Sequence, residues 1–305
     1  MKNTTPAVSV VIPCYNGIDS IGKTLDAILK QETTFDFEVI LVDSSKDGTD
    51  RFVAKEFPQV RLIHLGQQTL PGSGRNLGIL EAKGEIVLFT DADCVPKAGW
   101  IEGHYRTHQD VNCVAVGGSV INGYPRHYVA WVSHLIEFNE WTPESKRGKI
   151  WNNPSCNLSL KREAFLKLHV EFTDNWPDED TLFNWEVREK GGEIYFNPDL
   201  TIIHLNRMAF GKLFHHQYRL GKAVAVERQI TTLPGKIFLK VPILCLGLPF
   251  ARWLFALIRL LKTDLKTSLI FIWITPLFLC AAMAWSIGFM VKGEPRDAVI
   301  HIFEA

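Results

Sequence analysis

Short apolar runs alternate with helical patterns over the first third of the chain, and this alternation restricts the possible folds more than any other feature. The runs predict strands at Val8–Ile12, Glu38–Val42, Val60–Leu65, Ile86–Thr90 and Cys113–Gly117. Between the first two, apolar residues recur at steps of three and four, which is typical of a helix that buries one face. Strands that alternate with helices build βαβ units and a largely parallel sheet. We therefore expect an α/β fold.

The predicted strand Ile86–Thr90 runs directly into Asp91 and Asp93. Open α/β sheets bind ligands at the carboxyl ends of their strands, where two carboxylates one residue apart can converge on one ion. Hard cations such as Mg²⁺ and Mn²⁺ prefer oxygen ligands and share them with substrate phosphates. Acidic residues in solvent-exposed loops often have the same spacing, so the pair indicates a metal site only together with the motifs around it.

Four further motifs accompany this pair. They are Val8–Asn16 and Val39–Thr49, each a strand with polar residues at its end, the glycine-rich segment Gly72–Gly78, and Trp176–Asp180. With the two aspartates, this ordered set resembles the family 2 glycosyltransferases, which have the GT-A fold, use nucleotide-diphosphate sugars and invert the anomeric centre. The resemblance extends from Val8 to Arg219. It implies a Rossmann-like, mostly parallel sheet with flanking helices.

The resemblance implies a nucleotide site at the ends of the first two strands. Pro13 and Tyr15 would flank the base, and Asp43 would accept a hydrogen bond from it. Ser44 stands where the family more commonly has a second acid, so the base of the UDP- or GDP-sugar stays open. An alternative role for Asp43 is to cap the turn that follows it.

The departing diphosphate needs its growing charge neutralised. By resemblance Asp93 is the closer metal ligand, and Asp91 contacts the ribose or the ion, a Mg²⁺ or Mn²⁺ that would act as a Lewis acid. His204 follows an apolar run and is a further candidate ligand, with a purely structural role as the alternative. Arg75 and Asn76 lie in a glycine-rich loop expected to open a helix, where a guanidinium and free backbone donors favour the diphosphate or the sugar.

An inverting transfer is a single displacement, so the acceptor hydroxyl needs a base on the face opposite the leaving group. Asp180, just ahead of a predicted helix, matches the family's base position. Glu179 and Trp176 are expected on the acceptor side, as is Arg219. The segment His216–Leu220 that contains Arg219 only partly resembles the Gln-x-x-Arg-Trp motif of processive synthases, which favours single-sugar transfer over polymer synthesis.

Composition changes sharply near Lys236. The segment Ile237–Leu261 is mostly apolar, and residues 268–291 carry no charge. The second segment is long enough to cross a hydrocarbon core of about 30 Å at about 1.5 Å per residue, and we expect a membrane helix there. The first contains two prolines and Arg252, so it is expected either to span or to lie in the interface.

The sequence thus predicts a GT-A domain at residues 1–209, an amphipathic interfacial helix and linker at 210–236, two hydrophobic membrane-associated helices at 237–291 and a short polar tail at 292–305. A formal net charge of zero argues against nucleic acid as a partner. Six scattered cysteines without CxxC spacing fit a reducing compartment. Because the first strand leaves no room for a signal segment, we expect the catalytic domain to face the cytoplasm.

Together these features predict an inverting glycosyltransferase at the cell membrane that moves one sugar from a nucleotide-diphosphate sugar to a lipid-linked or amphipathic hydroxyl acceptor. The nearest alternative is a polyprenyl-phosphate glycosyltransferase. An alternative of another class is a non-catalytic module that binds nucleotide sugar and recruits partners to the membrane. The apolar tail is expected to be separable from a catalytic domain whose own core is complete.

Overall fold

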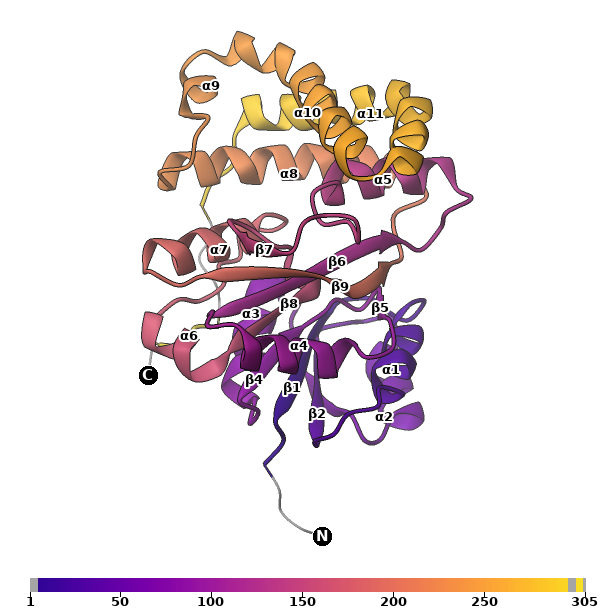
Figure 1. The fold of residues 1–305 in the computed structure, drawn as a ribbon, viewed down its shortest axis with the longest axis vertical. Helices are drawn as coiled ribbons and strands as arrows, with labels where there is room; N and C mark the ends of the chain where they lie inside the picture. The colour runs from indigo at the N-terminus through magenta and orange to yellow at the C-terminus, as the bar shows by residue number, and fades with distance from the viewer. Residues whose placement is uncertain (1–4, 296–299, 304–305) are drawn as a thin grey trace.

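The computed structural model describes residues 5–295 and 300–303. An α/β part with a central sheet forms the lower portion, and a layer of helices from the C-terminal third lies above it (Figure 1). The first described residues are at the bottom of this view, and residues 300–303 lie against the α/β part and not in the helical layer.

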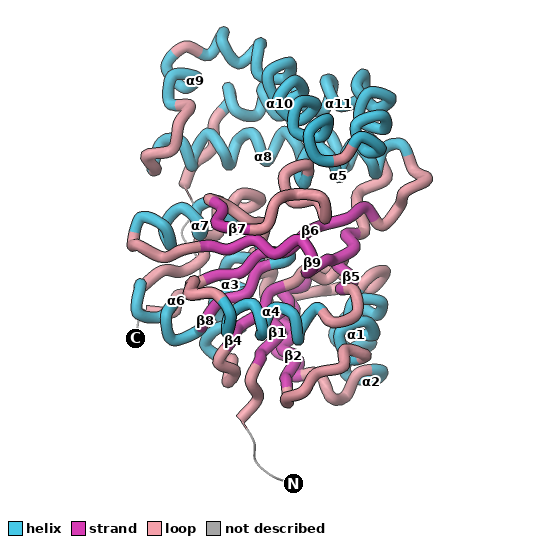
Figure 2. The backbone as a smooth tube through the Cα atoms, in the orientation of Figure 1, coloured by secondary structure: helices cyan, strands magenta, loops and turns pink. Residues whose placement is uncertain are grey.

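Nine strands of the described chain form one mixed sheet in the order β3-β2-β1-β4-β8-β6-β9-β5, with β7 paired to β9. The strands β1 to β4 pair in parallel, and β8 joins β4 to β6 through antiparallel pairs (Figure 2). The carboxyl ends of β1, β2 and β4 therefore meet at one edge. The strand bounds are β1 Val8–Cys14, β2 Phe37–Asp43, β3 Arg61–His64, β4 Ile86–Phe89, β5 Cys94–Pro96, β6 Ala115–Asn122, β7 Gly148–Ile150, β8 Leu158–Lys161 and β9 Ile194–His204.

Helices cover both faces of this sheet, as the alternating pattern predicts. Val10 and Ile12 of β1 enter one apolar cluster, and Val11 between them enters the other, because successive side chains of a strand point to opposite faces. The first cluster includes residues of α1 (Ile21–Leu29), α2 (Thr49–Glu56) and α4 (Trp100–Asp110). The second includes residues of α3 (Pro71–Glu81), α6 (Arg162–Leu168) and α7 (Glu179–Glu189).

The glycine-rich segment was expected to be a loop, but it forms the first turns of α3. The helix begins at Pro71, whose fixed φ and missing N–H suit a first helical position. A Cβ on Gly78 would lie 2.1 Å from a side chain of β1, so this glycine lets the helix press onto the sheet. Gly84, which follows this helix in sequence, could be read as a left-handed cap, but its φ is not positive: a Cβ there would lie 2.6 Å from the backbone nitrogen of Ser9, so close chain approach requires glycine.

Two strands are longer than their patterns predict. β6 starts at Ala115 and continues to Asn122, and its pairing with β9 shifts register between Gly118 and Ser119. The shift accommodates the extra residues of β9 between Asn197 and Thr201. The two apolar runs on either side of Pro198 therefore belong to one strand, β9.

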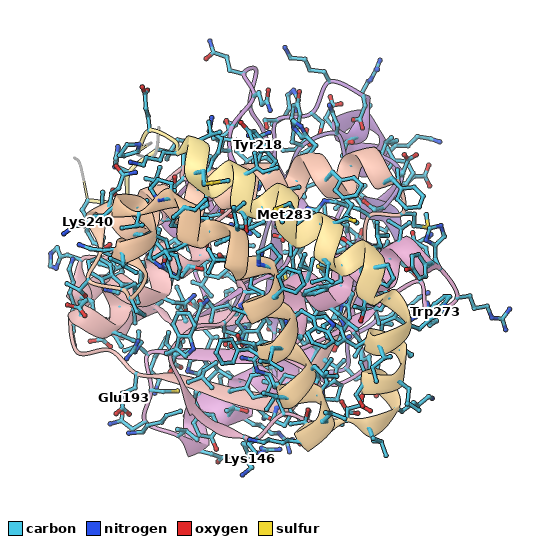
Figure 3. The ribbon with its side chains drawn as sticks, turned by 90° about the horizontal axis from the view of Figure 1, so that it is seen from above. Lys146, Glu193, Tyr218, Lys240, Trp273 and Met283 are labelled. Atoms are coloured by element: carbon cyan, nitrogen blue, oxygen red, sulfur yellow. The ribbon has the colours of Figure 1, made fainter. Side chains whose placement is uncertain are left out.

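The upper layer consists of α5 (Tyr128–Phe138), α8 (Phe210–Ile230), α9 (Lys236–Lys240), α10 (Leu248–Thr263) and α11 (Leu265–Val291). Two glycines bring α8 and α11 into backbone contact, since a Cβ on Gly221 would lie 1.9 Å from the carbonyl oxygen of Trp285 and one on Gly288 would lie 2.0 Å from that of Tyr218. Seen from above, α10 and α11 lie across the top of the molecule (Figure 3). Pro276 lies inside α11, and a proline within a helix commonly bends it.

The outer side of this layer is apolar. The segments Pro242–Thr263 and Leu265–Val291 are long and apolar enough to cross a membrane by length and composition. Prolines divide the first apolar segment into α9, the short helix Pro242–Gly247 and α10. In the structure each helix packs one side on the protein and leaves the other exposed, with the large apolar residues Phe250, Leu254, Phe255, Leu265, Leu269, Ile272 and Trp273 among the exposed ones.

Beyond α11 the chain returns to the α/β part. The backbone N–H of Ile300 donates to Ser73 Oγ at 3.1 Å, and its carbonyl accepts from Asn76 Nδ2 at 2.8 Å. The backbone N–H of Ile302 donates to Glu171 Oε2 at 2.8 Å. The tail is therefore in contact with the α/β part, because its end hydrogen-bonds to α3, and its helix α11 packs against α8; whether it can be removed stays a prediction.

Candidate active site

The site begins at the sheet edge where β1, β2 and β4 end. Asp91 follows β4, and the backbone N–H of Cys94 closes the turn by donating to the Asp91 carbonyl at 3.0 Å. From the neighbouring helix α3, Arg75 donates through Nη2 to Asp91 Oδ1 at 2.7 Å. The glycines of α3 place this helix close enough to the sheet for Arg75 to reach the turn.

Arg75 is buried between two carboxylates, since its Nη1 also donates to Glu179 Oε1 at 2.8 Å. The side chain is 2% exposed. Burial alone would lower the pKa of this guanidinium, but the charges of Asp91 and Glu179 hold it above its usual value. Arg75 is thus a fixed cation that joins the end of β4 to the start of α7.

Asp180 lies in the first turn of α7. Its Oδ1 accepts from the backbone N–H of Thr181 at 2.9 Å, and its Oδ2 accepts from the backbone N–H of Ser155 at 3.3 Å. Burial raises the pKa of Asp180, although Arg75 opposes the shift. Burial likewise raises the pKa of Glu179 to about 7. A carboxylate with a raised pKa is a stronger base than a solvated one, which suits proton abstraction.

Asp93 and His204 lie side by side, as predicted for a metal site, with 3.9 Å between Asp93 Oδ1 and His204 Nε2. Cys94 completes one cluster with them and another with Asp91 and Cys156. His204 Nδ1 is buried and has no hydrogen-bond partner among the described residues. Burial raises the pKa of the Cys94 thiol well above its usual value, so carboxylate and imidazole are the available donors. This donor set fits Mg²⁺ or Mn²⁺.

Asp43 ends β2 below the surface, and neighbouring side chains already hold both of its oxygens. Ser45 Oγ donates to Oδ1 at 2.5 Å, and His64 Nδ1 lies 2.7 Å from Oδ2. The backbone N–H of Ser45 also donates to Asp43 Oδ2 at 3.3 Å, as the alternative role in the following turn implies, while Thr49 at the start of α2 donates to Asp47. His64 is exposed at the end of β3, and sequence alone gives no sign that it shares this carboxylate.

The remaining predicted donor residues have different surroundings. Tyr15 is exposed just after β1, where its ring is open to a ligand, and Pro13 packs against Gly74 of α3. Asn76 is fully buried, with its amide donating to the Phe172 carbonyl and accepting from the Phe172 N–H, both at 2.9 Å. The prediction that Asn76 contacts the donor is therefore not supported, because its polar atoms bind the segment that precedes α7.

A cavity of about 490 Å³ extends from this edge to the upper helices. Arg75, Asp91 and Asp180 line it at one side, and residues of α8, α10 and α11 line it at the other. Trp176 also lines the cavity, whereas Arg219 lies with its guanidinium carbon 4.3 Å from the centre of the Trp176 ring and lines a neighbouring cavity. The structure thus brings most predicted catalytic and acceptor residues to one space.

Glu137 of α5 is a buried acid in the cavity wall that the sequence pattern does not reveal. Gln217 Nε2 donates to it at 3.0 Å, His216 Nε2 lies at 3.3 Å and Arg207 Nη1 at 3.4 Å. Burial alone would raise the pKa of Glu137, but His216 and Arg207 hold it well below its usual value. Its partners come from distant parts of the chain, so no local motif marks it.

A second unexpected group is a carboxyl pair between α7 and α8. Asp178, the N-cap residue of α7, and Glu227 of α8 both line the cavity, and Asp178 Oδ2 and Glu227 Oε1 are buried with no hydrogen-bond partner among the described residues. Burial, together with the nearby Glu227 charge, raises the pKa of Asp178 well above its usual value. The raised pKa favours the protonated form of Asp178, at the place where the helix of Asp180 faces the upper layer.

Comparison with known proteins identifies relatives over most of the chain. A model of the family described as Glycosyl transferase family 2 matches residues 9–175. Glycosyltransferase AglE of Haloferax volcanii is 29% identical over 233 residues, which cover 73% of this chain and 74% of AglE. Glycosyltransferase GlyG of Streptococcus pneumoniae is 32% identical over 234 residues, which cover 71% of this chain and 75% of GlyG.

Solved structures share the fold. A mannosyltransferase from Pyrobaculum calidifontis, PcManGT, in complex with GDP-Man and Mn²⁺, superposes with a TM-score of 0.60 at 20% identity, covering 96% of this chain and 89% of that one. S. aureus TarS in complex with UDP-GlcNAc gives a TM-score of 0.56 at 17% identity, with 93% and 89% covered. At these identities the likeness concerns the fold alone. The family match over more than half of the chain, with the similarity to GlyG, shows that the protein belongs to glycosyl transferase family 2 and is a glycosyltransferase with the GT-A fold.

Proposed function

We propose that the protein is an inverting glycosyltransferase that moves a single sugar from a UDP- or GDP-sugar to a hydroxyl of a lipid-linked or amphipathic acceptor, at a membrane that its catalytic domain faces from the cytoplasm. The observation that carries the proposal is the cavity, which joins Arg75, Asp91 and Asp180 to the apolar helices α10 and α11. The ligands in the PcManGT and TarS structures support a nucleotide sugar as donor.

On the donor side, the residues present fit a divalent cation held by Asp93 and His204, with Asp91 in the adjoining cluster of possible ligands. When bound there, Mg²⁺ or Mn²⁺ would offset the negative charge that develops on the departing diphosphate. Arg75 fixes the Asp91 carboxylate and adds a second positive charge at the same edge. Tyr15 is free to stack on the nucleotide base, while Asp43 supports the base pocket from below.

On the acceptor side, Asp180 takes the proton of the acceptor hydroxyl as the new C–O bond forms and the bond to the diphosphate breaks. Its raised pKa favours this proton transfer. Trp176 presents a ring to the cavity, and a flat aromatic face suits the apolar face of a sugar. Glu179 is engaged by Arg75, so it serves to hold that guanidinium.

The test is a panel of UDP- and GDP-sugars given to the full chain in detergent, with and without Mn²⁺, with an alkyl glycoside or extracted membrane lipid as acceptor. We expect one metal-dependent addition per acceptor from one donor. A ladder of products would contradict single transfer. Tight donor binding without hydrolysis or transfer would favour the non-catalytic alternative.

A lipid phosphate as the direct acceptor is the second candidate, and Arg252 in the cavity wall favours it, because it forms no ion pair with a described carboxylate. A phosphate is ionised without help from a base. Asp180→Asn would then retain transfer to a prenyl phosphate, whereas a hydroxyl acceptor requires the carboxylate.

A further inference from the structure

Among the described residues, five arginines line the cavity, and they differ in how their charge is balanced. Four of them form ion pairs with carboxylates of the cavity wall: Arg75 with Asp91 and Glu179, Arg207 with Glu137, Arg228 with Glu227, and Arg259 with Glu140. Arg252 has no such ion pair within the part of the chain that the structure describes. Among the described arginines of this cavity, Arg252 is therefore the one whose guanidinium is not in direct contact with a carboxylate.

Arg252 is nevertheless held in place. Its Nη2 donates to the Ile136 carbonyl of α5 at 3.3 Å, and its guanidinium carbon lies 4.6 Å from the centre of the Trp285 ring of α11. Nη1 is buried and has no hydrogen-bond partner among the described residues. A buried charged donor without a hydrogen-bond partner carries a desolvation cost in free energy. An anion that binds to Nη1 would offset this cost.

The surroundings of Arg252 indicate what kind of molecule carries that anion. Phe255 lies one turn farther along α10 and lines the same cavity, as does Trp285. Arg252 itself belongs to a helix whose other side is apolar and exposed. A ligand at this place meets a guanidinium and apolar rings together, so it combines an anionic group with an apolar chain.

We propose that Arg252 binds a phosphate group of the acceptor and thereby selects phosphate-bearing lipids over uncharged ones. Guanidinium N–H groups match phosphate oxygens well, and charge-assisted hydrogen bonds are stronger than neutral ones. The inference rests on the proposed function, since it takes the acceptor to enter the cavity that ends at Asp180. Inorganic phosphate offers the same anion without the chain, so the experiment has to separate the two.

The experiment measures binding of farnesyl phosphate, farnesol and inorganic phosphate to the full chain in neutral detergent by titration calorimetry. We expect Arg252→Gln to weaken farnesyl phosphate binding about 10- to 100-fold, the range for a hydrogen bond to a charged group. Farnesol should bind equally to both proteins. Arg259→Gln is the matched control, because Arg259 lies two turns along the same face of α10 but is paired with Glu140. It should bind farnesyl phosphate like the wild type.

Three results would overturn the assignment. One is equal farnesyl phosphate binding by wild type and Arg252→Gln. Another is inorganic phosphate that binds as tightly as farnesyl phosphate, which would make this a site for the free anion. The third is a loss of nucleotide-sugar affinity in Arg252→Gln, which would place Arg252 in the donor site. Should Arg252→Gln fail to fold, Arg252→Met, whose unbranched chain can still lie on Trp285, takes its place with the same expectations.

Different results would contradict the proposed reaction and the proposed phosphate site. Farnesyl phosphate binding that depends on Arg252, in a protein that transfers no sugar from any donor, contradicts the proposed reaction and supports the site. Metal-dependent transfer to alkyl glycosides, without any effect of Arg252→Gln on phosphate-bearing acceptors, supports the reaction and contradicts the site.

Discussion

Charge is concentrated in a few buried side chains at the start of the cavity. Arg75 sits between Asp91 and Glu179, so a single guanidinium sets the position of a donor-side carboxylate and of the helix that carries Asp180. Buried ion pairs contribute little net stability, but removing one partner leaves an unbalanced charge. We therefore infer that these ion pairs serve to position side chains. They fix the donor-side and acceptor-side groups relative to each other before either substrate binds.

Asp93→Ala tests the metal site. Asp93 is partly exposed and sits after β4, so its loss should leave the fold intact while it removes a metal ligand. We expect turnover in saturating Mn²⁺ to fall by about 10²-fold or more, comparable to the loss of other charge-stabilising groups. The measurement is donor hydrolysis against Mn²⁺ concentration, with the exposed acid Asp110→Ala as control. Unchanged turnover in Asp93→Ala would rule out Asp93 as a ligand.

Asp180→Asn separates catalysis from binding. The amide keeps the shape and, through its single oxygen, one of the two hydrogen bonds that Asp180 accepts from the backbone, but it cannot take a proton. We expect donor affinity to be retained and transfer to a hydroxyl acceptor to fall about 10²- to 10⁴-fold. In the wild type, transfer should decline as pH falls through the raised pKa of this carboxyl, since its protonated form is no base. Equal losses of donor affinity and transfer would make Asp180 a binding residue.

Glu137 gives a pH-dependent stability prediction. Its pKa in the folded protein is below the value of 4.5 expected in the unfolded chain, so the folded state holds this proton less tightly. The stabilisation is fully present above about pH 4.5 and is lost as pH falls through the folded pKa. We expect Glu137→Gln to lower the thermal midpoint at neutral pH and the difference from wild type to shrink below about pH 4.5. A difference that stays constant down to about pH 3 would contradict the assignment.

Single residues show where sequence reasoning succeeds and where it stops. Asp91 and Asp93 could be placed because each follows a strand whose end defines the binding edge. Asn76 was misassigned, since the same glycine-rich motif serves a loop or a helix, and only packing against Phe172 shows which way the amide points. Glu137 could not be found, because its charge is balanced by residues from two distant segments.

At the scale of elements, the alternating strands and helices of the α/β part follow from periodicity, whereas α3 and the upper layer depend on close approach between backbones. Gly78 lets α3 lie against β1, and Gly221 with Gly288 lets α8 lie against α11. From sequence alone, a glycine within a helical pattern predicts a less stable helix. In the structure these positions are where two elements come into contact.

Gly221→Ala tests the contact between α8 and α11. The added Cβ would lie 1.9 Å from the Trp285 carbonyl oxygen, so the helices must separate. We expect a loss of about 1–3 kcal/mol in the free energy of unfolding, typical of overpacking, and a greater loss of transfer to lipid acceptors than of donor hydrolysis. Gly211→Ala in the same helix is the control: no atom lies within 4 Å of its Cβ, and stability should be unchanged or slightly raised. Equal effects of the two variants would contradict a tight helix contact.

For the whole molecule, the main question is how the upper layer meets the membrane. Length and composition allow both apolar segments to cross a bilayer, with 22% of the first and 39% of the second buried against the protein. Yet α10 and α11 lie across the top of the α/β part, and α11 is fastened to α8 along its length (Figures 1 and 3). We infer that the exposed apolar side of this layer enters one leaflet while the other side closes the cavity.

Cysteine labelling tests this orientation, and it is done in a Cys280→Ser background because Cys280 is the exposed native thiol. Thr263 lies at the end of α10, between Lys262 and Lys266, whose charges favour the cytoplasmic side. A layer that enters one leaflet keeps this turn on the side of the catalytic domain. Thr263→Cys should then resist an impermeant maleimide in intact cells and react once the membrane is opened, in parallel with Lys146→Cys on the α/β part. Labelling of Thr263→Cys alone in intact cells would establish a hairpin that crosses the bilayer, and labelling of both would place the catalytic domain outside.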